Sequence, residues 1–187
     1  MGESFWKRLN KLRRVRPALY RQARFGAVEE ALQRLIADAG DADQRNNARA
    51  TLSSHYQFTG NNVAALKVIN EQLNEKPDDV QALIAMTEHH HYAQVDLVKA
   101  ADAVERALVL AIEQALLVRQ VLGVRMRIAL ESGKFDVAGD SLVRLVEYVP
   151  PTHSLDVAYE RDFLDMIPPG SIDAALIERY SALAAVA

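Results

Sequence analysis

Gly133-Lys134-Phe135-Asp136-Val137-Ala138, together with Pro150, is the stretch that decides the fold. Its glycine is expected to end one helix, because glycine readily adopts the left-handed conformation that closes a helix. Ala138 then begins the packing face of a second helix, which Pro150 ends seventeen residues after the glycine. The same order recurs at Gly60, Ala65 and Pro77, again with seventeen residues from glycine to proline. The chain therefore contains at least two copies of a helix–turn–helix repeat.

Weaker copies of this pattern extend the repeat over most of the chain. They occur at Gly26 with Ala31 and at Gly170 with Ala175. Successive marker alanines are 34, 35, 38 and 37 residues apart, at Ala31, Ala65, Ala100, Ala138 and Ala175. A period near 34 residues is typical of stacked helix pairs. No stretch alternates apolar and polar residues as a strand does, so the sequence predicts an all-α fold.

Composition limits the kinds of chemistry that the chain can perform. Its 187 residues are 50% hydrophobic and 25% charged, and they include no cysteine, which excludes disulfides, thiolate metal ligands and cysteine nucleophiles. No apolar run reaches the ~18 residues of a membrane-spanning helix. The basic N-terminus has no apolar segment behind it, so no signal peptide is expected. These features favour a cytoplasmic protein.

Apolar residues at helical spacing place the individual helices. We expect about ten of them and no sheet. Residues 110–118 contain no proline or glycine, so the helix at about 114–132 should be long or bent. The remaining expected segments are about 5–16, 27–38, 45–58, 62–75, 79–93, one around Ala100, one ending near Pro150, and a last pair at 154–167 and 171–186.

Two of the repeats carry large, small and aromatic residues at fixed positions. Residues 46–79 have Leu52, Ser53, Tyr56, Gly60, Ala65, Ile69 and Pro77, and residues 119–152 have Leu122, Gly133, Phe135, Ala138, Leu142 and Pro150. This pattern resembles the tetratricopeptide repeat family, from which the chain departs at Arg49, Gln72 and Arg125. Residues 80–118 share Leu83, Met86, Ala100, Val104 and Ala107 but lack the turn glycine and the final proline. Residues 12–45 and 154–187 are degenerate.

The resemblance implies an architecture and a kind of function. The architecture would be a right-handed α–α superhelix, a solenoid over residues 17–187, with residues 1–16 as a basic amphipathic arm or a capping helix. The repeats would span about 12–45, 46–79, 80–118, 119–152 and 154–187. Such a scaffold would be a non-enzymatic adaptor that binds a protein or peptide partner in its concave groove.

In this family the first helix of each repeat lines the groove. The resemblance therefore implies a mixed polar surface that suits a peptide with an acidic portion, although the same face could equally be solvated and serve only as a spacer. The Lys/Asn/Lys/Arg set with which related repeats hold a C-terminal carboxylate is not reproduced. The implied partner-binding residues are Tyr20, Arg24, Asn47, Ser54, Gln57, Phe58, Glu88, His91 and Arg127.

Histidines and carboxylates give little indication of a metal site or of catalysis. His89, His90 and His91 are consecutive, and successive helix residues turn by 100°, so the three side chains cannot converge on one ion. We expect His90 to point inward and His91 to face the groove. The chain has no His-Glu-x-x-His motif, no phosphate-binding glycine loop and no Gly-x-Ser-x-Gly elbow. No cofactor is expected.

The N-terminal segment is strongly basic. Residues 1–24 hold eight basic residues and one acid, whereas the rest of the chain holds 14 basic and 24 acidic residues. Three interpretations of this arm stay open: a helix that caps the first repeat, an interfacial helix with Phe5 and Trp6 in an anionic membrane, or an arm for an acidic partner. Nucleic acid is the less favoured partner of the last kind. The cations concerned are Lys7, Arg8, Lys11, Arg13, Arg14 and Arg16.

Two alternatives to a simple adaptor follow from these features. The chain could be a membrane-peripheral assembly or biogenesis factor that its basic N-terminal helix recruits. It could also be the repeat domain of a larger enzyme. The sequence does not name the partner, the pathway or the oligomeric state.

Overall fold

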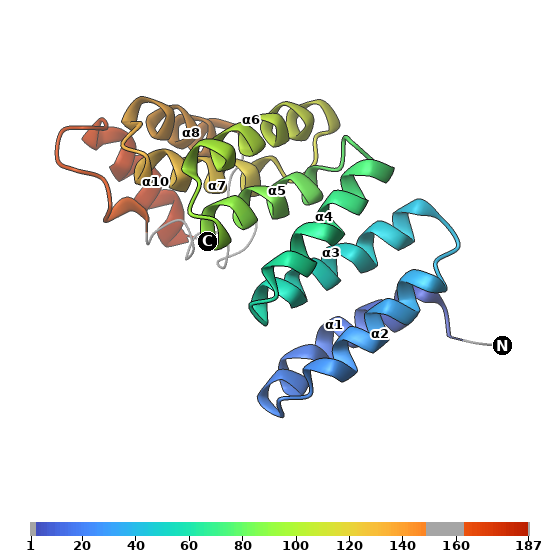
Figure 1. Ribbon diagram of the computed structural model, residues 1–187. Helices are drawn as coiled ribbons and strands as arrows, with labels where there is room; N and C mark the ends of the chain where they lie inside the picture. The colour runs from blue at the N-terminus through green and yellow to red at the C-terminus, as the bar shows by residue number, and fades with distance from the viewer. Residues whose placement is uncertain (1–2, 149–162, 187) are drawn as a thin grey trace. The chain divides into compact units, whose positions relative to one another are not determined.

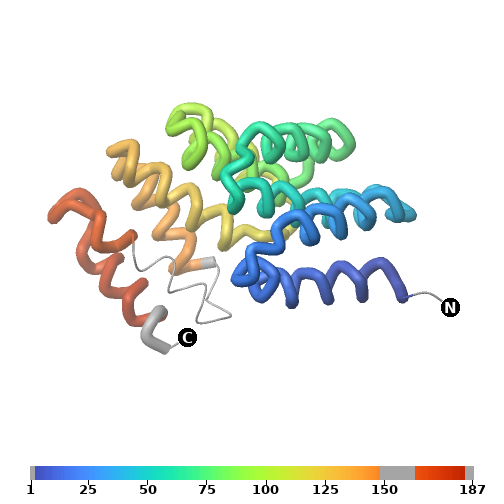
Figure 2. Tube along the Cα trace, turned by 60° about the horizontal axis from the view of Figure 1, so that its bottom comes forward, coloured from blue at the N-terminus to red at the C-terminus, as the bar shows by residue number. Residues whose placement is uncertain are grey.

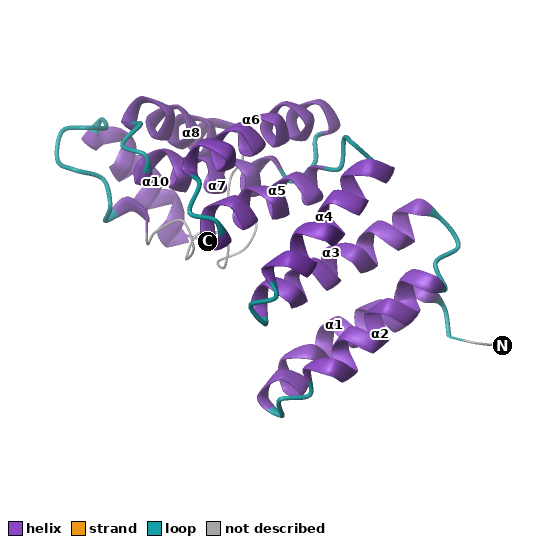
Figure 3. Cartoon of the chain, viewed as in Figure 1, coloured by secondary structure: helices purple, strands orange, loops and turns teal. Residues whose placement is uncertain are grey.

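The computed structural model describes residues 3–148 and 163–186, and within these ranges all regular structure is helical (Figure 3). The all-α prediction is therefore confirmed. The chain divides into two compact units, Met1–His89 and His90–Ala187. The first unit holds α1 (Phe5–Arg21), α2 (Phe25–Ala37), α3 (Ala42–Phe58), α4 (Asn62–Glu75) and α5 (Val80–Glu88). A π-helical turn, His89–Ala93, leads into α6 (Leu97–Gln114), α7 (Val118–Glu131), α8 (Phe135–Tyr148) and α10 (Ala174–Val186).

In the first unit each helix packs against the next, and α3 also contacts α1 and α5 (Figure 1). Side-chain oxygens cap the helix starts: Asp41 accepts from the Gln44 amide at 2.7 Å, and Asn61 accepts from the Ala64 amide at 3.2 Å. The apolar stripes of the helices meet in one continuous core. Its buried members include Leu9, Leu12, Val28, Leu32, Ala48, Leu52, Tyr56 and Ala65.

The N-terminal helix is longer than the expected 5–16 segment. α1 continues through Pro17 to Arg21 and runs antiparallel to α2 beside it (Figure 2). Phe5 and Leu9 on its inner face are only 8% and 0% exposed. Residues 5–16 therefore belong to the same helix as residues 17–21, and this helix packs against α2. The membrane interpretation needed Phe5 at the surface, and the structure contradicts that placement because this ring is part of the core.

In the second unit α7 packs between α6 and α8, and α8 contacts α10. The expected long or bent helix at 114–132 is wrong, because the chain breaks at residues 115–117. Ala115 and Leu117 adopt left-handed conformations with φ of 50° and 57°, so the chain turns there without a glycine. Each costs roughly 1–2 kcal/mol for an ordinary L-residue. The expected pair at 154–167 and 171–186 lies partly outside the described residues.

The repeat markers behave as expected in the central part of the chain. Ala65, Ala100 and Ala138 are completely buried, and Gly60 and Gly133 have positive φ at their turns. At the ends the pattern weakens, since Ala31 is half-buried and Ala175 is exposed. Gly26 is not a turn residue either. It lies within α2, and Ala23 takes the left-handed conformation between α1 and α2 instead.

Candidate functional site

Two helices of the first unit present polar side chains to each other. On α1, Arg13, Arg16 and Tyr20 follow at intervals of three and four residues, which places them on one face. On α3, Asn47, Ser54 and Phe58 follow at intervals of seven and four residues, which also places them on one helix face. Because α1 contacts α3 directly, these two stripes form one surface.

A polar cavity of about 360 Å³ lies on this surface. α1 contributes two arginines, α3 contributes an amide and two hydroxyls, and α5 contributes a second amide. Within residues 3–148 and 163–186 no carboxylate lines the cavity, and its two ionised groups are both cations. The lining residues are Arg13, Arg16, Asn47, Ala50, Thr51, Ser54 and Gln81.

Arg13 is held in place by α3. Its Nε donates to Thr51 Oγ1 at 3.0 Å, and its Nη2 donates to the Asn47 carbonyl oxygen at 3.1 Å. Burial, and after it the charge of Arg16, lower the pKa of the Arg13 guanidinium below its ordinary value. Both causes oppose the charged form, yet arginine stays protonated at neutral pH. The site therefore holds a fixed positive charge with neutral hydrogen-bond partners only.

Arg16 is held less firmly. Its guanidinium carbon lies 5.8 Å from the centre of the Tyr20 ring, a weak cation–π contact. In the part of the chain that the structure describes, neither Arg16 nor Arg13 forms an ion pair with a carboxylate. By contrast, Arg8 on the same helix pairs with Asp38 at 2.7 Å. Two neighbouring cations without an acid are unusual in a purely structural network.

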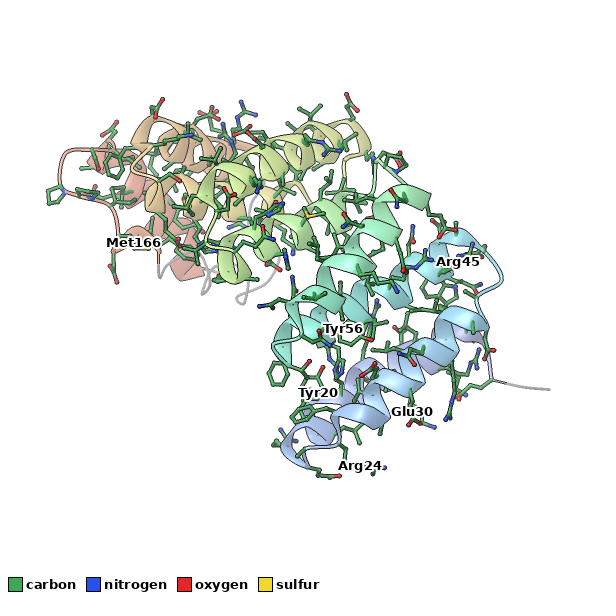
Figure 4. All side chains as sticks on the ribbon, viewed as in Figure 1. Tyr20, Arg24, Glu30, Arg45, Tyr56 and Met166 are labelled. Atoms are coloured by element: carbon green, nitrogen blue, oxygen red, sulfur yellow. The ribbon has the colours of Figure 1, made fainter. Side chains whose placement is uncertain are left out.

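An aromatic cluster lies one helical turn beyond the cavity. The rings of Tyr20 and Phe58 stack with centroids 4.3 Å apart and an interplanar angle of 10°, and Phe25 lies 5.6 Å from Tyr20. Phe58 is 63% exposed although it is fully apolar. Figure 4 shows Tyr20 beside the end of α3, with Arg24 at the tip of the turn that follows α1. The cluster offers rigid apolar area to a partner.

Tyr20 is fixed by a buried histidine. Its hydroxyl lies 2.8 Å from Nδ1 of His55, which is 1% exposed. Burial is the largest influence on His55 and lowers its pKa, with Arg16 acting in the same direction and Glu29 opposing them. The imidazole is therefore neutral at pH 7, and its Nδ1 shares one hydrogen bond with the Tyr20 hydroxyl. Burial also raises the pKa of Tyr20, so its hydroxyl stays protonated.

The structure brings together part of the predicted site. Asn47 and Ser54 line the cavity, and Tyr20 and Phe58 form the neighbouring stack. The other three predicted residues of this unit have different surroundings. Arg24 is exposed in the α1–α2 turn, Gln57 donates to the Ala85 carbonyl oxygen at 3.3 Å, and Glu88 is half-buried at the end of α5.

His91 and Arg127 belong to the second unit, and the structure contradicts their prediction as accessible binding residues. Arg127 is 1% exposed and donates to the Tyr92 hydroxyl at 2.6 Å. His91 is 8% exposed, with Nε2 at 2.5 Å from a carboxylate oxygen of Glu131. Both side chains thus stabilise the interior of that unit.

The π-helical turn explains the error. An α-helical register was expected to place His90 inside and His91 on the surface. In His89–Ala93 the wider turn shifts this register, so that His89 and His91 are buried and His90 is only half-buried.

Several residues of this surface are absent from the predicted binding set. The resemblance to the repeat family places Arg13 and Arg16 on the groove face, and the charge pattern also assigns them to the basic arm; in the structure both line the cavity. Thr51 and Phe25 were missed altogether. Thr51 follows Asn47 by one helical turn, which is a usable signal for a shared face. Phe25 lies in the first turn of α2, and no periodicity indicates that it would meet Tyr20.

A larger cavity in the second unit has a different character. It measures about 1000 Å³ and lies among α6, α7 and α8. Its charged lining residues are two arginines and two acids, Arg119, Arg144, Asp140 and Glu147. This cavity therefore carries no excess charge, unlike the one between α1 and α3.

Comparison with models of known protein families gives no match, and comparison with curated proteins gives none either. Within residues 3–148 and 163–186 no group of three metal-ligating side chains comes together. No helix in these ranges is both long and apolar enough to cross a lipid bilayer. Functional inference therefore rests on the geometry of the side chains.

Proposed function

We propose that the protein is a non-enzymatic interaction module, similar to tetratricopeptide repeat adaptors, that binds an anionic segment of a partner protein along α1 and α3. One observation carries the proposal. Arg13 and Arg16 lie in the same polar cavity, one of them partly desolvated, and among the residues that the structure describes no carboxylate lines it. An incoming anion would supply the missing charge.

The energetics favour an external anion at this place. Burial, and after it the repulsion from Arg16, lower the pKa of Arg13. A carboxylate or phosphate would replace this repulsion by charge-assisted hydrogen bonds, which are about twice as strong as neutral ones. The guanidinium of Arg13 is already oriented by Thr51 and Asn47, so little further ordering is needed on binding.

A peptide suits the surface better than a free ion does. The cavity opens beside the stacked rings of Tyr20 and Phe58, and the latter is largely exposed. Aromatic side chains next to arginines are the usual composition of protein-binding hot spots. A free anion would occupy the cavity but would leave the aromatic surface uncovered.

A second candidate function is electrostatic binding to an anionic membrane surface. It is favoured by Lys7, Lys11 and Arg14, which are exposed and share the face of α1 opposite its buried residues. Because Phe5 is buried, such binding would be peripheral, without insertion of the apolar stripe. Sedimentation with vesicles containing phosphatidylserine tests it, and a Lys11→Glu, Arg14→Glu variant should lose that binding.

The main proposal is tested by selection from a random peptide library displayed on phage, with the full-length protein as bait. Wild type should enrich peptides that contain Asp or Glu. Arg16→Glu should weaken the selected peptides about tenfold or more, the effect of one lost charge-assisted contact. Lys67→Glu, a reversal at an exposed position of α4, is the matched control and should retain binding within about twofold. Equal binding to Arg16→Glu, or no enrichment by wild type, would contradict the proposal.

A further inference from the structure

We infer that the bound segment carries an anionic side chain and an aromatic side chain two residues apart in an extended conformation. The anionic group lies between Arg13 and Arg16, and the aromatic ring covers Phe58. This inference rests on the proposed function and specifies its ligand. An aspartate carboxylate and a phosphoserine phosphate both provide the anionic group.

The spacing follows from the geometry of the two helices. Arg16 and Tyr20 on α1 are four residues apart, as are Ser54 and Phe58 on α3. Four residues of α-helix rise about 6 Å. On each helix, the cavity residue and the aromatic residue are therefore separated by the same rise of about 6 Å along the axis. In an extended chain, side chains on one face recur every two residues, or about 6.6 Å, which matches this step.

The size of the cavity favours an extended ligand over a helical one. Its volume of about 360 Å³ corresponds to a few side chains. A helix docked on α1 and α3 would need an axis separation of about 8–10 Å from each of them. The cavity contains polar side chains from three helices and no apolar trough, and a docked amphipathic helix requires such a trough.

The aromatic part of the surface is rigid and incompletely covered. Tyr20 is fixed from below by its hydrogen bond to buried His55, and Phe58 stacks on it. The exposed fraction of Phe58, 63%, shows that most of its surface still faces solvent. A ligand ring can therefore pack against Phe58 with little loss of protein conformational entropy, which is the property of a hot spot.

The anionic part of the surface complements the aromatic part. Arg13 is fixed, whereas Arg16 contacts the Tyr20 ring and makes no hydrogen bond with the other residues that the structure describes, so it can turn toward an anion without breaking one of these bonds. The Ser54 hydroxyl lines the same cavity and can donate as well. Loss of the anion and loss of the ring should therefore act at different places and be nearly additive.

The experiment uses the full-length protein and fluorescein-labelled peptides in fluorescence polarisation. The parent peptide is Gly-Ser-Asp-Ser-Phe-Ser-Gly. The peptide of reverse order, Gly-Ser-Phe-Ser-Asp-Ser-Gly, is measured as well, because a ligand of either chain direction places the two side chains two residues apart. Changing Asp to Asn, or Phe to Ala, should each weaken the better-binding order about tenfold, or 1.4 kcal/mol. A peptide with three residues between Asp and Phe should lose a similar factor. A phosphoserine version distinguishes phosphate from carboxylate as the preferred anion.

Protein variants locate the two contacts. Phe58→Ala should bind the parent peptide about tenfold more weakly and should no longer respond to the Phe-to-Ala change in the peptide. Arg16→Gln should respond less to the Asp-to-Asn change than wild type does, because only Arg13 then faces the anion, and should keep the response to the ring. Val63→Ala, a change at an 83% exposed apolar residue on α4, is the control and should leave all affinities unchanged. Circular dichroism confirms that each variant is folded.

The outcomes separate this inference from the proposed function. If the peptide with Phe changed to Ala binds as well as the parent and binding still requires Arg16, the inferred aromatic contact is wrong and the proposed function stands. If the three-residue spacing binds better than the parent, the ligand is not extended and the inference is likewise overturned. If no peptide of the set binds, and library selection with wild type also fails, both the inference and the proposed function fail.

Discussion

Arg16→Gln should leave the stability of the first unit almost unchanged, although it removes an arginine at the centre of the candidate site. The substitution removes the cation–π contact with Tyr20, which is worth about 0.5–1 kcal/mol at a partly exposed position. It also removes repulsion between Arg16 and Arg13, of the order of 0.2–1 kcal/mol for a pair near the surface. The two effects nearly cancel, so the free energy of unfolding should change by less than about 0.5 kcal/mol.

Arg13→Gln is the informative comparison, because the same chemical change is made at a hydrogen-bonded arginine. It removes the bonds to Thr51 Oγ1 and to the Asn47 carbonyl oxygen, which are both donated by a charged group. Relief of the repulsion with Arg16 offsets part of this loss. The net cost should be about 1.5–3 kcal/mol.

Urea denaturation at pH 7, followed by tryptophan fluorescence, measures both changes. Trp6 is the chain's single tryptophan, and it lies on α1 with its ring 5.3 Å from that of buried Phe5. Its emission therefore reports the unfolding of the first unit. Raising the salt from about 0.05 M to about 0.5 M should lower the relative stability of Arg16→Gln, because wild type then loses its repulsion through screening. A cost for Arg16→Gln equal to that of Arg13→Gln would show that Arg16 is structural and would refute its role as a binding residue.

Three further predictions follow from buried residues. Ala138→Leu should destabilise the second unit by about 1–3 kcal/mol in thermal or urea melts followed by circular dichroism, because Ala138 is 0% exposed; a neutral result would refute its close packing. Arg127→Ala should cost on the order of 2–4 kcal/mol, while Arg106→Ala at an exposed position should cost less than about 0.5, and equal effects would contradict the buried placement. His55 has a lowered folded pKa, so its contribution is complete above about pH 6.5 and declines as the pH falls below that value. When the pH is lowered from 7.5 to 5.5, the free energy of unfolding of wild type should therefore fall more than that of His55→Gln. Tyr20→Phe is a control that keeps the histidine. Parallel pH profiles of wild type and His55→Gln would refute this assignment.

The helix pairs were predictable because their determinants are local. Gly60 and Gly133 adopt positive φ where the pattern requires a helix end, and Ala65 and Ala138 are fully buried where it requires close packing. Glycine at a left-handed turn and alanine at a helix crossing are each selected by short-range sterics. Such signals survive in a single sequence without knowledge of the tertiary structure.

The breaks in the second half of the chain were not predictable by the same rules. The turn at residues 115–117 uses Ala115 and Leu117 in left-handed conformations, which the residue types themselves disfavour. The π-helical turn at His89–Ala93 likewise has no sequence signature and shifts the register that follows. At residues 115–117 the packing of α6 against α7 overrides local preference. The placement of His91 and Arg127 failed because neither break in the helices was expected.

Departures from the repeat pattern have a tertiary explanation. Arg49 interrupts an apolar position of the pattern, but it pairs with Glu71 and Glu75 from the neighbouring helix. Arg125 is the seventh residue of the repeat at 119–152, whereas Arg49 is the fourth residue of its own repeat, and Arg125 is held by Glu105 and Asp140, each at 2.7 Å. The same exchange of an apolar contact for an ion pair thus occurs twice, with partners on the adjoining helices. Each arginine is compensated by acidic residues that lie elsewhere in the sequence, so the residues next to it in the chain do not reveal the pairing.

The basic helix α1 shows why charge alone could not locate the site. Its cations are lysines and arginines on one helix, yet they have three different surroundings. Arg8 pairs with an acid, Lys11 and Arg14 face solvent, and Arg13 and Arg16 meet α3. The 100° step per residue separates these faces, but only the packing of Phe5, Leu9 and Leu12 against the core decides which face meets another helix. What distinguishes the site is therefore that no carboxylate of the described chain lies beside the arginines that meet α3, and that property belongs to the fold.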